Sequence, residues 1–109
     1  MSVPYEKTLE AYLCKKVKSL GGKCLKLTGE AGIPDRLVIL PGGRYIFVEL
    51  KREGEKPRPI QDFRIQQLMY LGCNVLIIDS EEDIRRELYY EIHSSRLPKE
   101  VHICNNEEE

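Results

Sequence analysis

Two acids and a lysine are spaced in this chain so that they meet at one end of a predicted β-hairpin over residues 35–51. Asp35 lies at the entrance to the first strand, two residues before its apolar run at 37–40, and Glu49 and Lys51 close the second strand. Between the runs, residues 41–44 read Pro-Gly-Gly-Arg, which is typical of a tight turn. Because strand side chains alternate between faces, Glu49 and Lys51 point the same way, beside the start of the neighbouring strand. The spacing therefore predicts a charged site at the hairpin end.

Asp35 and Glu49 offer the oxygen ligands that a divalent cation requires. Mg²⁺ suits such a pair because few carboxylates hold it and it keeps waters for a phosphate substrate. The backbone carbonyl of Leu50 is placed to be a third ligand. Lys51 could orient or deprotonate a water, or neutralise charge on a scissile phosphate. This combination favours metal-assisted phosphodiester hydrolysis; the alternative from the residues alone is a surface ion-pair cluster.

Two further polar residues are expected near this site. Glu10 lies on the first predicted helix and could add a carboxylate to the metal, directly or through water. Acids in early helical turns also serve the helix dipole and solvent, and Glu6, one turn before Glu10, is a competing candidate. Gln61, at the start of the second predicted helix, could hold Lys51 or the water by a hydrogen bond.

The elements that must position these residues alternate between helix and strand. Apolar periodicity and turn residues predict helices over residues 5–20, 59–71 and 81–92, and strands over 23–28, 37–40, 45–51 and 74–78. Ile65, Leu68 and Met69 are predicted to form the inner face of the second helix. A strand, a helix and a strand in succession predict a parallel pair with a right-handed connection. The fold class is therefore α/β, with helices flanking a mixed four-stranded sheet.

Composition limits the class of protein. The 109 residues are enough for one domain, which we assign to residues 1–92, followed by an acidic C-terminal tail at 93–109. No apolar run reaches the length of a membrane helix, and the first residues lack the pattern of a signal peptide. The four cysteines are scattered in sequence, which favours reduced thiols in the cytoplasm over a zinc site.

The charge is unevenly distributed. Residues 1–78 carry 13 Lys and Arg against 8 Asp and Glu, whereas residues 79–109 carry 4 against 10. A basic body is compatible with phosphate contacts even though the net charge is -1.

The motifs together resemble the VRR-NUC (virus-type replication-repair nuclease) domain of the PD-(D/E)xK nuclease superfamily. The resemblance lies in Gly32-Ile33-Pro34-Asp35-Arg36, Pro41-Gly42-Gly43-Arg44, Phe47-Val48-Glu49-Leu50-Lys51 and Gln61. It extends to Glu10, Leu13, Val17, Gly21-Gly22 and Lys26, and so covers roughly residues 6–80.

The resemblance implies a restriction-endonuclease-like αβββαβ(α) core and a DNA endonuclease that depends on Mg²⁺ or Mn²⁺. Asp35, Glu49 and Lys51 match the signature triad, Glu10 the acid of the first helix, and Gln61 the family glutamine. Small members of the family are similar to phage-encoded nucleases that act as homodimers on branched DNA such as four-way junctions. This implies a DNA-repair role, in the host-cell cytoplasm if the chain is phage-encoded.

Six cations are expected around the site as DNA contacts: Lys26, Arg36, Arg52, Lys56, Arg58 and Arg64. Some of them should meet phosphates and make binding depend on salt. Two other functions remain open from the sequence, a DNA-binding module that has lost turnover and a sequence-specific restriction-type nuclease.

Overall fold

One mixed sheet of four strands forms the centre of the molecule. The computed structural model describes residues 5–94. Its elements are α1 (Tyr5–Ser19), β1 (Lys23–Lys26), β2 (Arg36–Leu40), β3 (Arg44–Leu50), α2 (Pro59–Tyr70), β4 (Val75–Ile78) and α3 (Glu81–His93). The strands lie in the order β1-β2-β3-β4, antiparallel except for the parallel pair β3 and β4. The predicted α/β class and the parallel connection are confirmed.

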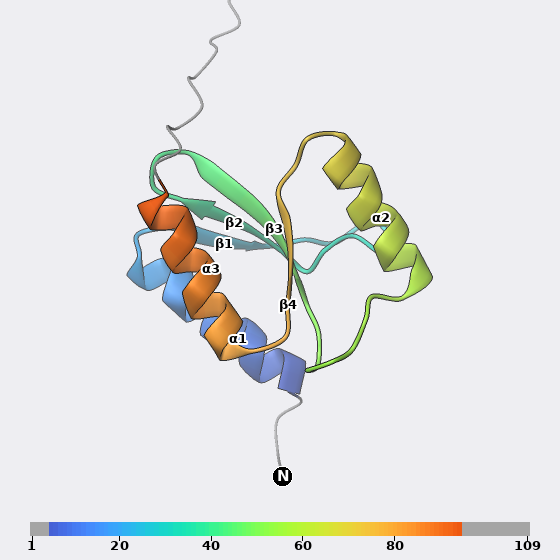
Figure 1. Cartoon of the computed structure of the whole chain (residues 1–109), viewed down its shortest axis with the longest axis horizontal. Coiled ribbons are helices and arrows are strands. Elements are labelled where there is room, and N and C mark those ends of the chain that lie inside the picture. The colour runs from blue at the N-terminus through green and yellow to red at the C-terminus, as the bar shows by residue number, and fades with distance from the viewer. Residues whose placement is uncertain (1–4, 95–109) are drawn as a thin grey trace, which may run out of the picture.

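The helices are divided between the two sides of the sheet. Figure 1 shows α1 and α3 side by side against the sheet, with α2 standing apart from them. The main core lies between the sheet and the α1–α3 pair, and its buried side chains are Leu9, Leu13, Val17, Val38, Leu40, Ile46, Val48, Leu50, Ile78, Ile84 and Leu88. This layer fixes α1, which carries Glu10, over the same sheet that carries Glu49.

The hairpin of β2 and β3 forms as the sequence predicts. Leu40 pairs with Arg44 across the turn, and Arg36 pairs with Val48 near the open end. Gly42 and Gly43 adopt φ values of 90° and 77°, a left-handed conformation that is strained for residues with a Cβ. The register places Asp35, one residue before β2, beside the end of β3.

The second helix starts at the turn between β3 and β4. Pro59 occupies its first position, where a missing N–H costs nothing. Gln61 accepts a hydrogen bond from the backbone N–H of Arg58 at 2.8 Å and so caps the helix. A Cβ added to Gly32, whose φ is 80°, would lie 2.6 Å from the carbonyl oxygen of Ile60. The loop that leads to Asp35 is therefore in direct contact with the first turn of α2.

The structure departs from the sequence prediction in two details. β1 ends at Lys26 and not at the predicted residue 28, because its partner strand β2 begins at Arg36, opposite Lys26. Met69 was predicted on the inner face of α2 but is 45% exposed, whereas Ile65 is buried. Met69 lies about 100° around the helix from Leu68, outside the narrow stripe that meets the sheet. The predicted tail falls, except for residues 93 and 94, outside the described residues.

The third helix begins at a side-chain cap. The hydroxyl of Ser80 accepts a hydrogen bond from the backbone N–H of Asp83 at 3.1 Å, which begins α3. Ile84 and Leu88 then pack into the core. No helix within residues 5–94 is both long enough and apolar enough to cross a membrane.

Candidate active site

A cleft opens where α1, the end of β3 and the start of α2 meet. Its volume is about 210 Å³, and it is lined by Glu6, Lys7, Glu10, Asp35, Glu49, Leu50, Lys51 and Gln61. All six residues that the sequence nominated for metal binding or catalysis lie on this lining. The structure therefore brings together in one cleft residues that are up to 51 positions apart in sequence.

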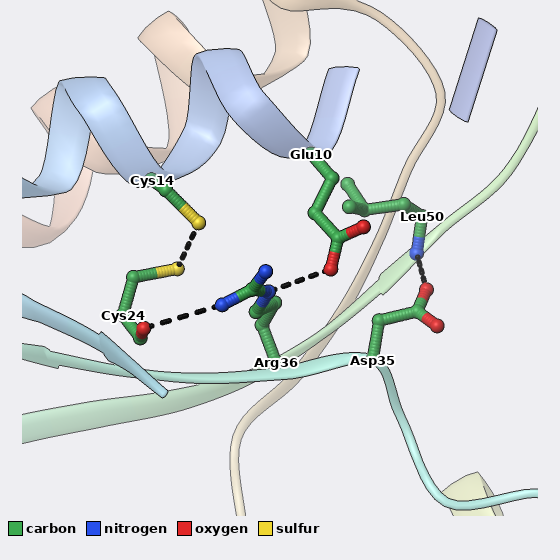
Figure 2. Close-up of polar contacts among 6 residues, drawn as sticks. All are labelled: Glu10, Cys14, Cys24, Asp35, Arg36 and Leu50. Atoms are coloured by element: carbon green, nitrogen blue, oxygen red, sulfur yellow. Dashed lines mark hydrogen bonds and ion pairs between the residues drawn. The ribbon is translucent and has the colours of Figure 1, made fainter. Parts of the chain in front are cut away.

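The backbone of β3 holds Asp35 in place. The Oδ2 atom of Asp35 accepts a hydrogen bond from the N–H of Leu50 at 2.8 Å, as Figure 2 shows. Burial raises the pKa of Asp35 above its ordinary value, and the Leu50 hydrogen bond acts in the opposite direction. This contact uses one oxygen of Asp35 and leaves Oδ1 for another partner.

Glu49 is the most deeply buried acid of the cleft. Its residue exposure is 1%, and its Oε1 atom has no hydrogen-bond partner within the described part of the chain. Its Oε2 atom lies 3.5 Å from the Nζ of Lys51. Burial and the neighbouring Asp35 carboxylate raise the pKa of Glu49 to about 7, although Lys51 opposes this shift. A buried carboxylate oxygen without a partner is costly unless a proton or a cation joins it.

Lys51 is held from two sides. Besides its contact with Glu49, its Nζ donates a hydrogen bond to the Oε1 of Gln61 at 2.7 Å. Gln61 Oε1 is the same atom that caps α2 through the Arg58 N–H. The ammonium group is therefore fixed at the cleft instead of extending into solvent.

The donor set fits Mg²⁺ or Mn²⁺. Among residues 5–94, no three His, Cys, Asp or Glu side chains converge as a metal-binding cluster. Mg²⁺ does not require one, because it is commonly held by one or two carboxylates and completes its shell with water and phosphate oxygens. Two carboxylate oxygens are available to such a cation. They are Glu49 Oε1, which has no partner in the described chain, and Asp35 Oδ1, which the Leu50 hydrogen bond does not use.

Glu10 reaches the cleft from α1, but it is also tied to the sheet. Its Oε2 accepts a hydrogen bond from the Nε of Arg36 at 2.6 Å, with side-chain exposures of 21% for Glu10 and 17% for Arg36. Figure 2 shows the other carboxylate oxygen of Glu10 directed away from Arg36. Glu6 also lines the cleft, where it lies 3.7 Å from the exposed Nε of Arg52.

The other cations predicted as DNA contacts lie in varied surroundings. Lys26, Arg52, Lys56 and Arg58 are exposed. Arg64 is partly buried, donates to the carbonyl oxygen of Ala31 at 3.0 Å and lies 3.6 Å from Glu30.

The sequence prediction missed Lys7, which lines the cleft. Its position three residues before Glu10 on the same helix was the available signal, because residues at this spacing share a face.

Comparisons with known proteins agree with this geometry. No family model matches the sequence. The chain is 43% identical over 79 residues to "Putative nuclease p44" of Acyrthosiphon pisum secondary endosymbiont phage 1, a match that covers 71% of this chain and 85% of the relative. A solved structure described as a VRR_NUC domain superposes with a TM-score of 0.76 at 33% sequence identity, covering 81% of this chain and 98% of the other. With the fold, the cleft and both relatives in agreement, the chain belongs to the VRR-NUC nuclease family.

Proposed function

We propose that this nuclease is a DNA endonuclease that hydrolyses phosphodiester bonds with a divalent metal ion. The observation that carries the proposal is the buried Oε1 of Glu49, which has no partner among the described residues and sits beside Asp35 and Lys51 in an open cleft. A cation between the two acids would remove their mutual repulsion, which raises the pKa of Glu49. A substrate phosphate could then approach an otherwise acidic site.

Asp35, Glu49 and the backbone carbonyl of Leu50 would hold Mg²⁺ or Mn²⁺, with Glu10 joining directly or through a water. The ion would supply Lewis acidity at the phosphate and a water of lowered pKa. Lys51, with its Nζ fixed by Gln61 at 2.7 Å, orients the attacking water or balances negative charge on the phosphate. Gln61 acts on the reaction through Lys51.

Cations near the cleft, four of them exposed and one partly buried, supply the contacts to the DNA backbone. Lys26, Arg52, Lys56, Arg58 and Arg64 are assigned this role in the proposal. Arg52, Lys56 and Arg58 all lie on the loop that joins β3 to α2. Each phosphate contact should contribute to a salt-dependent affinity, because it releases counterions from the DNA.

We further propose that the enzyme acts on branched DNA as a homodimer, in the cytoplasm of a host cell. A single cleft cuts one strand, and a two-fold pair can cut two. The outer surface of α2 supports a second copy, because Ile60, Phe63, Tyr70 and Leu71 are 40%, 58%, 90% and 69% exposed. Apolar side chains grouped on one surface are typical of an interface. The phage origin of the relative supports the host-cell setting.

The test is a cleavage assay with linear duplex, flap and four-way-junction DNA in Mg²⁺, Mn²⁺ or EDTA. We expect metal-dependent products, with the junction cut fastest, and none in EDTA. Glu49→Gln should abolish cleavage while leaving the far-UV circular dichroism spectrum unchanged. Glu82→Gln is the matched control, because Glu82 is exposed on α3 and lies outside the cleft lining.

Other outcomes would select another function. Binding of all three DNAs without a metal-dependent product would indicate a non-catalytic binding module. A fixed set of cuts on linear plasmid DNA, with no preference for branches, would indicate a restriction-type nuclease. Full activity of Glu49→Gln would remove the proposed mechanism.

A further inference from the structure

Arg36 is not placed as a DNA contact normally is. Its Nε donates to Glu10 Oε2 at 2.6 Å, and its Nη1 donates to the carbonyl oxygen of Cys24 at 3.4 Å. Its side chain is 17% exposed. Figure 2 shows the guanidinium group lying between Glu10 on α1 and Cys24 on β1. Two of its three nitrogens, Nε and Nη1, therefore bind groups of the protein.

Arg36 also lies outside the cleft, although it directly follows Asp35. Glu10 and Asp35 line the cleft, and Arg36 does not. Neighbouring residues at the start of a strand point to opposite faces. Asp35 therefore enters the cleft directly, whereas Arg36 can reach it only through Glu10.

We propose that Arg36 is a positioning residue, which holds the Glu10 carboxylate at the cleft and joins α1 to the edge of the sheet. This inference rests on the proposed nuclease function. Glu10 shares the cleft with Asp35 and Glu49, whose negative charges repel it when no cation is present. The Arg36 guanidinium offsets this repulsion and fixes the direction of one carboxylate oxygen. The other oxygen then stays available to a metal-bound water.

The arrangement requires the shape of arginine as well as its charge. One guanidinium group spans Glu10 and the Cys24 carbonyl through two different nitrogens. A lysine has a single ammonium nitrogen and cannot reproduce this planar, two-sided contact. Arg36→Lys should therefore keep the positive charge but no longer hold the Glu10 carboxylate in place. If Arg36 only attracted DNA by its charge, Arg36→Lys would retain activity.

The experiment compares Arg36→Lys and Arg36→Met with Lys56→Met in the full chain. Lys56 is the matched control, because it is a proposed DNA contact, is exposed and lies outside the cleft lining. Cleavage is measured across a Mg²⁺ titration, and DNA affinity is measured in EDTA at several salt concentrations. Thermal unfolding of each variant reports folding.

We expect both Arg36 variants to lower kcat by about tenfold or more, the size typical of losing a charge-assisted hydrogen bond. The Mg²⁺ concentration for half-maximal rate should rise, while DNA affinity and its salt dependence stay unchanged. Lys56→Met should instead weaken DNA binding and reduce its salt dependence, with the Mg²⁺ requirement unchanged. A general loss of stability would not change the Mg²⁺ requirement selectively.

A double-mutant cycle tests whether Arg36 acts through Glu10. In a Glu10→Gln background, Arg36→Lys should cause no further loss of kcat, because the acid that it positions is gone. If Arg36→Met does not fold, Arg36→Lys carries the cycle alone.

Three results would overturn the inference: additive losses in the cycle, weaker salt dependence of binding in the Arg36 variants, or wild-type cleavage by both variants. A wild-type chain that cuts no substrate with any metal would overturn the proposed function as well. If the wild-type chain cuts DNA and the Arg36 variants cut it equally well, only the inference about Arg36 is overturned.

Discussion

The Nζ of Lys51 and the Oε1 of Gln61 lie 2.7 Å apart, and that same oxygen accepts the Arg58 N–H that caps α2. One atom thus serves both the start of a helix and the orientation of the cleft lysine. Because both bonds depend on the Gln61 side chain, the order of the first turn of α2 and the position of Lys51 are linked.

Gln61→Ala should lower the cleavage rate and destabilise α2 together. The loss of a hydrogen bond to a charged group predicts a decrease of about tenfold in kcat, and the lost cap about 1 kcal/mol in the free energy of unfolding. Gln66→Ala is the control, since Gln66 is exposed on the same helix. Single-turnover cleavage and urea unfolding measure the two effects. Unchanged cleavage would show that Lys51 keeps its position without Gln61.

Glu49 should make the metal-free protein less stable as the pH rises. Burial and the Asp35 carboxylate raise its pKa from 4.5 to about 7 in the folded chain. Between these values the folded state retains a proton that the unfolded state has released, so the free energy of unfolding falls with increasing pH. Urea unfolding in EDTA, at pH values near 4.5 and near 7, measures this decrease in the free energy of unfolding. Glu49→Gln should reduce it, and identical pH profiles for the two proteins would contradict the assignment.

Leu13→Ala should destabilise the fold without acting on the cleft directly. Leu13 is fully buried between α1 and the sheet. Truncation of such a residue leaves a cavity and costs about 2–5 kcal/mol. Met69→Ala serves as the control, because Met69 is 45% exposed and is not among the residues of the proposed dimer surface. Urea unfolding compares the two, and similar midpoints would mean that α1 does not pack as described.

The thiols of Cys14 and Cys24 should form a disulfide when the protein is oxidised. Their sulfur atoms lie 3.1 Å apart, as drawn in Figure 2. One glutathione disulfide would be consumed and two glutathione molecules released for each bond formed. Burial and the neighbouring Cys14 thiol raise the pKa of Cys24 to about 12, so the reaction should be slow at neutral pH.

Mass spectrometry after alkylation detects this bond, and the bridge should stabilise the chain by about 2–3 kcal/mol for a loop of this length. Cys24→Ser removes the bond and serves as the control. Free alkylation of both thiols after oxidation would contradict the predicted geometry.

Local rules were sufficient to predict the hairpin and to place Asp35, Glu49 and Lys51 in one cleft. A turn at residues 41–44 fixes the register of β2 and β3, and this register alone brings Asp35 beside Glu49. The position of Gln61 followed from its place at the start of a helix. These residues were predictable because each depends on neighbours in the chain or on one short connection.

Contacts across the α1–sheet interface were not predictable in the same way. The contact between Glu10 and Arg36 and the approach of Cys14 to Cys24 depend on how α1 rotates and slides over the sheet. Helical periodicity predicts which face of α1 is buried. It does not predict the rotation of α1 about its axis precisely enough to say which individual side chains meet. The exposed Met69 shows the same limit for α2. How many residues of this helix are buried depends on the sheet surface against which it packs.

The close approach of Gly32 to Ile60 gives a criterion for sorting related chains. A side chain at position 32 would collide with the backbone of Ile60, so the loop before Asp35 or the first turn of α2, which carries Gln61, would have to shift. A relative could then keep every charged residue of the motif and still hold its lysine out of reach of the phosphate. We expect such a relative to cut DNA poorly even though its acids and its lysine are all present.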